Sequence, residues 1–494
     1  MTKSTSLDIA VVGSGICGMC AAMTLASQGH RLTLFERDGP PPAGDADAAF
    51  FDWRRTGAAQ FRHPHAFLGL MCNLIETHYP ELLEAFLQAG ARQVKFADML
   101  NPTLQANYHP LPGDEKLWVL LCRRATMETV IRRHVASLKN VEIRNHIRVT
   151  GLLTEDGSTR VNATGLTIDE SGQHTEFKAD LVIDASGRTS RFPGWLKERG
   201  LTVPEEKDDA EIVYYTRHYR LSPGAAEPPR GKHPGAGDLG YLKFGVFPGD
   251  NGNFAIILCL PIQEKALITA VRSPDRFDTI CRSIPGLEPW VREGKSVSTT
   301  EPFGIADIQA VWRHFLDERG NPLLHNFFAL GDAAVRTNPL YGRGCSLGVL
   351  HAQILTEVLA THSDPERRAV HFAERTEAEL RPIFEASLRE DRSGIRRAAE
   401  ILSGRLSNKP NTLKKWFSLS FGEALRAASG QEIEVFRGVM RTFHLLEKPG
   451  EFLKESTIRR KVLRYMLRGR RKNAAARFEA GPDRMSMHSM LGIL

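Results

Sequence analysis

The segment from Leu7 to Arg37 constrains the fold of this chain more than any other. It reads as an apolar strand, a turn with the glycine spacing GxGxxG, an alanine-rich helix and a second strand. In that pattern Gly13 permits a tight turn, Gly15 lets the backbone approach a pyrophosphate, and Gly18 lets the helix pack on the strand. The helix N-terminus then stabilises phosphate charge. The segment therefore predicts a Rossmann-like dinucleotide site.

The acid that ends this unit indicates which dinucleotide binds. Glu36 follows Gly13 by 23 residues, where an acidic side chain accepts hydrogen bonds from ribose hydroxyls. An acid there suits an unphosphorylated ribose, so FAD or NAD is favoured over NADP. Ser14 and Arg37 flank these positions and belong to the predicted site. A second GxGxxG match, at residues 235–240, follows a proline-rich loop and precedes no helix, and we interpret it as accidental.

A second glycine-rich segment, "GDAAVRTNPLYGRGCSLG" at residues 331–348, follows the short apolar run "HNFFAL". Gly342, Gly344 and Gly348 give a turn without side chains at the start of a helix, as is found where a backbone approaches a ligand. A simple NAD dehydrogenase needs no second glycine-rich site so far along the chain. One elongated cofactor that reaches both clusters favours FAD.

A third segment, "KADLVIDASGRTSRFPGWL" at residues 178–196, completes a family pattern. Together the three segments resemble the sequence marks of FAD-dependent monooxygenases of the para-hydroxybenzoate hydroxylase type, over roughly residues 7–370. The resemblance implies that Asp332 hydrogen-bonds the ribityl chain. It also implies that Arg124, before the helix in "LLCRRATMETVIRRHV", contacts the cofactor, with Arg123 as the alternative. The helix start that would face the flavin pyrimidine edge comprises Pro339, Gly342, Gly344 and Cys345.

The segment "WRRTGAAQFRHPHAFLG" at residues 53–69 is similar to the flavin epoxidases of polyether ionophore biosynthesis and their bacterial relatives. On this resemblance His63 and His65 are candidates to line the flavin or substrate cavity, and Tyr341 is a third catalytic candidate. The alternative role of one or both histidines is to hydrogen-bond the loop. No metal site is expected, because the HxH pair lacks a supporting Cys, Asp or Glu cluster. The tryptophan motif of flavin halogenases is absent, which disfavours halogenation.

The middle motif departs from the family pattern and leaves the source of electrons open. Ser186 stands before Gly187, where many hydroxylases have Asp-Gly. That region is linked to pyridine-nucleotide handling in the family. NADH or NADPH is therefore expected as the reductant, used either directly or through a separate flavin reductase.

A chain of 494 residues is long enough for two or three domains. We predict an α/β fold with a Rossmann-like FAD-binding domain of the glutathione reductase type, formed by residues 1–205 and 321–365. Residues 206–320 carry strand signals such as "NFAIILCLPI" and are expected to form a mixed-sheet substrate domain, mainly β. Residues 366–494 are expected to be a helical, basic C-terminal extension.

The formal net charge is +7, and the excess lies mostly in residues 456–472. That segment has the pattern of a basic amphipathic helix, which suits either packing on the protein or contact with an anionic membrane surface. Seven scattered cysteines argue against a disulfide framework, and no apolar run is long enough to span a membrane. We therefore expect a cytoplasmic protein, with membrane-peripheral contact as an alternative and no nucleic-acid partner.

The leading hypothesis is an FAD-dependent monooxygenase that places one oxygen atom from O2 into a lipophilic small molecule. The resemblance implies epoxidation or hydroxylation through a flavin C4a-hydroperoxide. Two alternatives remain: an FAD-dependent reductase of isoprenoid double bonds, like geranylgeranyl reductases, and a flavin-binding membrane-associated protein.

Overall fold

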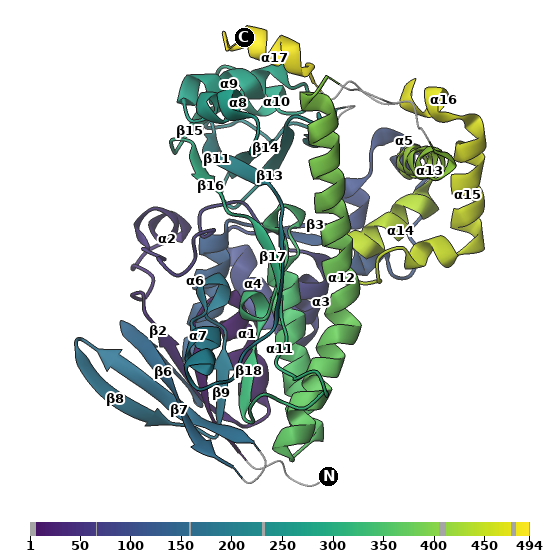
Figure 1. The fold of residues 1–494 in the computed structure, drawn as a ribbon. Helices are drawn as coiled ribbons and strands as arrows, with labels where there is room; N and C mark the ends of the chain where they lie inside the picture. Colours follow the sequence, from purple (N-terminus) through teal and green to yellow (C-terminus); the bar gives the residue numbers. More distant parts are fainter. Residues whose placement is uncertain are drawn as a thin grey trace.

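The computed structural model describes residues 6–65, 67–157, 160–229, 233–404, 412–475 and 481–493 (Figure 1). Its central element is a five-stranded sheet in which all neighbouring strands are parallel. The strand order is β18 (Phe327–Ala329), β9 (Leu181–Asp184), β1 (Asp8–Val12), β2 (Arg31–Glu36) and β5 (Val141–Asn145). Strands separated by more than 300 residues therefore meet in one sheet.

Helices and a small antiparallel sheet cover this parallel sheet. Helix α1 (Ile16–Ser27) packs against α11 (Gly344–Thr361) and α6 (Arg124–Ser137). The strands β6 (Ile147–Asp156), β7 (Val161–Glu170) and β8 (Gln173–Lys178) form an antiparallel sheet beside β2 and β9. Because it is covered, β1 is apolar after Asp8: Ile9, Ala10 and Val11 are all at most 1% exposed.

A second, antiparallel sheet lies beyond the parallel one (Figure 1). Side chains alternate along its strands: Tyr215 and Tyr219 pack into one apolar core, whereas Tyr214 belongs to another on the opposite face. Its strands are β12 (Ala236–Asp238), β13 (Lys243–Pro248), β14 (Asn253–Pro261), β11 (Ile212–Leu221) and β15 (Ser296–Ser298), with β16 (Phe303–Ile305) also on β11. Residues of α8 (Lys265–Ala270), α9 (Pro274–Ser283) and α10 (Glu288–Val291) share the core with Tyr215 and Tyr219, which leaves the opposite face free to line a cavity.

Helix α12 (Pro365–Leu402) is the longest element and runs alongside both parts of the molecule (Figure 1). Its middle part makes ion pairs with a three-stranded sheet. The strands of this sheet are β10 (Glu205–Asp209), β17 (Gln309–Arg313) and β19 (Val335–Arg336). Arg381 binds Glu206 of β10 at 2.8 Å, and Arg392 binds Asp208 at 2.6 Å. Further along, Arg397 binds Asp238 of β12 at 3.1 Å.

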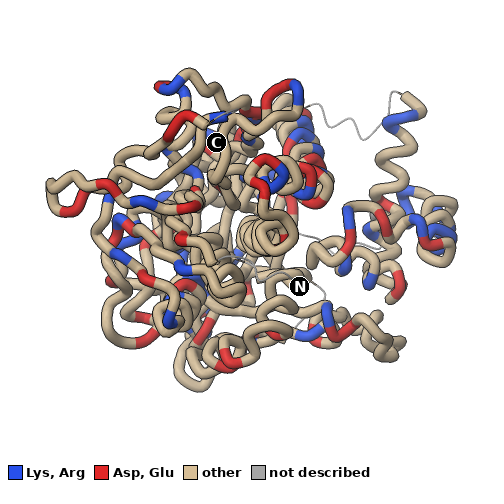
Figure 2. Tube along the Cα trace, turned by 90° about the horizontal axis from the view of Figure 1, so that it is seen from below, with Lys and Arg blue, Asp and Glu red and all other residues tan. Residues whose placement is uncertain are grey.

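The C-terminal region is helical, as predicted. The helices α13 (Leu413–Ser429), α14 (Ile433–Phe443), α15 (Ser456–Arg468) and α16 (Arg470–Ala475) form a bundle, and α17 (Arg484–Met490) returns to the core of the antiparallel sheet. Ile458 and Val462 of the basic segment are buried in this bundle. Figure 2 shows basic and acidic residues side by side there, and Lys461 pairs with Glu432 and Glu434.

The predicted fold class, a Rossmann-like domain with a second sheet and a helical C-terminal region, is confirmed. The predicted boundaries between the three regions stay a prediction, and residues 230–232 of the proline-rich loop before the second GxGxxG match lie outside the described residues. Across the described ranges, no helix combines the length and apolar character needed to cross a bilayer. The remaining elements are α2 (Ala46–Asp52), α3 (Gly69–His78), α4 (Pro80–Gln88), β3 (Arg92–Val94), α5 (Pro102–Gln105), β4 (Val119–Leu121) and α7 (Phe192–Glu198).

Candidate functional site

A cavity of about 440 Å³ lies at the carboxyl ends of β1, β9 and β18 and extends to the antiparallel sheet. Ligands of open α/β sheets bind at this end of the strands. The cavity brings together twelve of the residues predicted from the sequence, from both glycine clusters: Gly13, Gly15, Glu36, Arg37, His63, His65, Arg124, Asp332, Pro339, Gly342, Gly344 and Cys345. The two clusters are therefore walls of one cavity.

Three predicted residues do not line this cavity. The Ser14 side chain is buried, and its hydroxyl donates to Glu36 Oε2 at 2.8 Å. Gly18 lies inside the strand–helix unit, where an added Cβ would stand 2.0 Å from the Gly13 oxygen. The Tyr341 hydroxyl donates to Asp391 Oδ1 of α12 at 2.7 Å, so this side chain is directed to α12.

The glycines that border the cavity leave room for a phosphate-containing group. An added Cβ at Gly15 or Gly344 would meet no protein atom within 4 Å. Gly15 precedes the first turn of α1, whose free N–H groups favour an anion. Glycine is thus not needed at Gly15 for packing, and its missing side chain leaves space in the cavity wall. The residues present fit the pyrophosphate of a dinucleotide.

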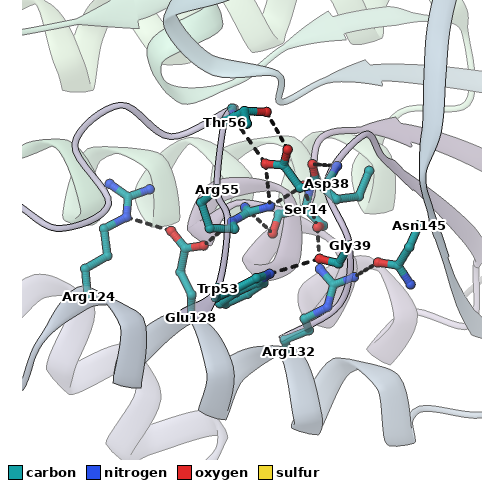
Figure 3. A network of polar contacts seen from close by, with 12 residues as sticks. Ser14, Asp38, Gly39, Trp53, Arg55, Thr56, Arg124, Glu128, Arg132 and Asn145 are labelled. Atoms are coloured by element: carbon teal, nitrogen blue, oxygen red, sulfur yellow. Dashed lines mark hydrogen bonds and ion pairs between the residues drawn. The ribbon is translucent and has the colours of Figure 1, made fainter. Parts of the chain in front are cut away.

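A buried network of charges supports one end of the cavity (Figure 3). The Arg55 guanidinium lies 2.9 Å from Glu36, 3.5 Å from Asp38 and 3.1 Å from Glu128. Burial alone would raise the pKa of Glu36, but the charge and hydrogen bond of Arg55, with further hydrogen bonds, lower that pKa to about 2. Glu36 therefore stays a carboxylate, the form that accepts hydrogen bonds from hydroxyl groups.

Arg124, and not its neighbour Arg123, reaches the cavity. Arg124 Nε donates to Glu128 at 2.6 Å, and its Nη1 lies 2.9 Å from His65 Nε2. Arg123 instead binds Asp250 at 2.6 Å, and it does not border the cavity. Because an arginine can only donate, His65 Nε2 must be the acceptor, which leaves its Nδ1–H to donate to the His63 carbonyl at 2.8 Å.

The two histidines are held as neutral rings. Burial lowers the pKa of His63 to about 3. Burial, and after it the Arg124 charge, lowers the pKa of His65 well below its usual value. His63 Nδ1 lies 2.8 Å from the hydroxyl of Thr216 on β11, and its ring packs edge-on against Tyr214. His63 thus borders the cavity as an uncharged hydrogen-bonding group.

The far end of the cavity is apolar. Six residues of the antiparallel sheet and its neighbouring loops supply this wall: Tyr214, Phe247, Ile257, Ile305, Ile308 and Leu340. The strand signals in the sequence predicted a substrate domain here but singled out none of these side chains, because the alternation along a strand does not reveal which face borders a cavity. It also missed Arg55, although the quoted segment at residues 53–69 contains it.

Comparison with known proteins agrees with this geometry. Residues 8–207 match the family described as "FAD binding domain". Protein Rv3254 of Mycobacterium tuberculosis is 27% identical over 363 residues, covering 71% of this chain and 72% of its own length. Kynurenine 3-monooxygenase of Salinispora arenicola is 23% identical, covering 72% and 73%. The crystal structure of p-nitrophenol 4-monooxygenase PnpA from Pseudomonas putida covers 89% of this chain and 98% of its own, with a TM-score of 0.58 and 17% identity.

The N-terminal part of the chain is thus an FAD-binding domain, and the chain is a flavoprotein. It is an FAD-dependent oxidoreductase whose fold is shared with flavin monooxygenases, as the sequence resemblance predicted.

Proposed function

We propose that this protein is an FAD-dependent monooxygenase that transfers one oxygen atom from O2 to an apolar small molecule. The observation that carries the proposal is the joining of a dinucleotide cradle and an apolar wall in one cavity. The names of two relatives, kynurenine 3-monooxygenase and p-nitrophenol 4-monooxygenase, support the reaction class. Bound FAD would supply the redox and oxygen chemistry, and the protein supplies binding and orientation.

Each end of the cavity has a distinct part in this proposal. Gly13 and Gly15, with Glu36 and Arg37, would hold the adenosine and pyrophosphate, and Asp332 would hold the ribityl chain. Arg124 keeps a positive charge at the cavity through its contact with Glu128. The apolar wall would take the substrate and exclude water from the reacting atoms.

His63 would orient the substrate rather than transfer a proton at neutral pH. Its low pKa keeps the ring uncharged, and because Nδ1 is paired with the Thr216 hydroxyl, Nε2 is the nitrogen that would bond the substrate. The electrons would come from NADH or NADPH, directly or through a separate flavin reductase. The basic segment at residues 456–472 packs Ile458 and Val462 in the C-terminal bundle, and contact of its charged side with an anionic membrane surface stays the alternative.

Isotope labelling tests the proposed reaction. The purified protein, loaded with FAD and supplied with NADH or NADPH plus a flavin reductase, is incubated with a panel of apolar compounds under ¹⁸O-labelled dioxygen. A product that gains one labelled oxygen atom is expected, and labelled water should contribute none. A product that gains two hydrogens under strict anaerobiosis would instead establish the alternative, a reductase of double bonds.

A further inference from the structure

The turn between Asp332 and α11 is anchored to the long C-terminal helix α12. Asp391 Oδ1 accepts from the Asn338 amide and from the Tyr341 hydroxyl, each at 2.7 Å. One helical turn earlier, Ser387 accepts from Arg343 at 2.7 Å. All three donors come from the six residues that precede Gly344, the first residue of α11.

The residues between these anchors form the cavity wall. Pro339, Leu340 and Gly342 border the cavity, whereas the side chains of Asn338, which precedes them, and of Tyr341, which lies between Leu340 and Gly342, bind α12. The wall also contains a backbone conformation that favours glycine, since Gly342 has a φ of +67°. The segment is a single 3-10 turn, Pro339–Tyr341, in which the Gly342 N–H donates to the Pro339 carbonyl at 3.0 Å and the Leu340 N–H donates to Asn338 Oδ1 at 3.0 Å. Because Asn338 caps this turn and Tyr341 ends it, the two side chains that α12 holds are the ones that place the turn in the cavity wall.

Asp391 is a buried acceptor for two hydrogen-bond donors of the turn. Asp391 is 5% exposed and Asn338 is 0% exposed, so water does not compete for the bond between them, and the bond from the Tyr341 hydroxyl is partly buried. Among the described residues no cation lies within ion-pair distance of Asp391, and its carboxylate accepts from the two donors of the turn. A buried carboxylate is costly unless hydrogen bonds compensate it. A carboxylate kept at this position therefore has a role tied to the turn.

We propose that Asp391 is a positioning residue for the FAD site: it acts through Asn338 and Tyr341 to fix the wall formed by Pro339, Leu340 and Gly342. The C-terminal region thus contributes to cofactor binding although it lies outside the matched FAD-binding domain. This inference rests on the FAD site and not on oxygen transfer, so it holds equally for a flavin reductase.

Titration of the FAD-free protein with FAD tests the proposal without any turnover. In Asp391→Ala both donors lose their acceptor, and the dissociation constant for FAD should rise about tenfold, the combined effect of losing two bonds that contribute about threefold each. The visible absorption spectrum of bound FAD should also change, because the ring environment shifts with the wall. Asp391→Asn keeps an Oδ1 acceptor and should restore most of the affinity. Glu385→Ala, on the exposed face of the same helix, is the matched control and should bind like wild type.

A second variant keeps the proposal testable if Asp391→Ala does not fold. Tyr341→Phe removes one hydroxyl and should weaken FAD binding about threefold, the effect of losing one of the two bonds that fix the wall. If Asp391 acts through Tyr341, the double variant should bind FAD no more weakly than Asp391→Ala alone. Wild-type affinity and an unchanged flavin spectrum in folded Asp391→Ala, or in Tyr341→Phe, would overturn the proposal.

Discussion

At the scale of single residues, the glycines of one motif have different physical roles. Gly13 has a φ of +100°, and an added Cβ would lie 2.6 Å from the Ala185 oxygen, so the fold itself requires glycine there. Gly15 has an ordinary extended backbone, and its Cβ would meet nothing within 4 Å. Only the ligand restricts the side chain at Gly15. Substitution can therefore separate cofactor binding from folding.

Gly15→Val should abolish FAD binding while the protein stays folded. The branched side chain fits the protein but fills the space left for the pyrophosphate. Purified variant should be colourless and should not bind added FAD in a fluorescence titration, with an FAD-free unfolding midpoint close to that of wild type. Gly13→Val is the contrast, because it should fail to fold. Yellow, FAD-bound Gly15→Val would show that the motif does not hold the cofactor.

Asp332→Ala should weaken FAD binding through loss of a charged acceptor. Burial raises the pKa of Asp332, while the nearby charges of Arg336 and Arg124 oppose the shift. A charge-assisted hydrogen bond contributes about 1.5–3 kcal/mol, so the dissociation constant should rise at least tenfold. Calorimetric titration with FAD measures this change, and Asp317→Ala on an outer loop is a control. Equal affinity of the two variants would reduce the Gly331–Asp332 motif to a structural turn.

The sequence predicted the glycines and Asp332 because these motifs are local: a few neighbouring residues define each turn. It did not predict the network around Arg55, which joins Glu36, Asp38 and Glu128 from separate segments. Such contacts depend on how those segments pack, and an arginine in sequence looks the same whether it becomes buried or stays in solvent. The same limit explains why the sequence did not predict that the Tyr341 side chain binds α12: its partner Asp391 lies 50 residues further along the chain.

At the scale of elements, close helix packing holds the two halves of the cavity together. Helix α1 lies on the β1 turn at Gly18, and α11 lies on α1 where Gly348 faces Cys17. An added Cβ at Gly348 would come within 3.1 Å of the Cys17 Cβ. Strand and helix types were predictable from periodicity, but the sheet order, which places β18 next to β9, was not. Order is set by packing between elements, which periodicity does not encode.

Gly18→Ala should destabilise the protein strongly, by about 1–3 kcal/mol or more, as overpacking in a close-packed core does. Its Cβ would lie 2.0 Å from the Gly13 oxygen, and backbone cannot move aside as a flexible side chain can. Urea denaturation of FAD-free protein measures the free energy of unfolding. Gly422→Ala, on an exposed helix position with open space, should be neutral or slightly stabilising. An equal effect of both substitutions would contradict the packing argument.

At the scale of the whole molecule, several histidines are buried as neutral rings in different parts of the fold. Burial lowers the pKa to about 3 for His351 and to about 4 for His444. His351 accepts from the Gly331 N–H, and His444 accepts from the Gly69 N–H. Protonation would remove both acceptors and bury a charge. Each ring therefore links folding to pH.

The free energy of unfolding should fall as the pH drops below about 6.5, where unfolded histidines take up protons that the folded protein excludes. Each such histidine contributes a slope of about 1.4 kcal/mol per pH unit, until the pH reaches its folded pKa. Glu36 acts in a lower range: its stabilisation is complete above about 4.5, the usual value, and is lost towards pH 2. Urea denaturation of FAD-free protein at pH 7.5, 6.5 and 5.5 measures the slope. His351→Gln should reduce it, and a constant free energy across this range would contradict neutral burial.

Because the cavity wall depends on α12, FAD can bind only after α12 has been synthesised. Gly344 and Asp391 are synthesised more than 300 residues after the first glycine cluster. At roughly 5–20 residues per second, that interval lasts on the order of 20–70 seconds. During that time the nascent chain carries half a cradle with no opposite wall. Cofactor loading is then a step that follows the synthesis of α12, and free FAD in the cell binds a chain that already contains both walls of the cavity.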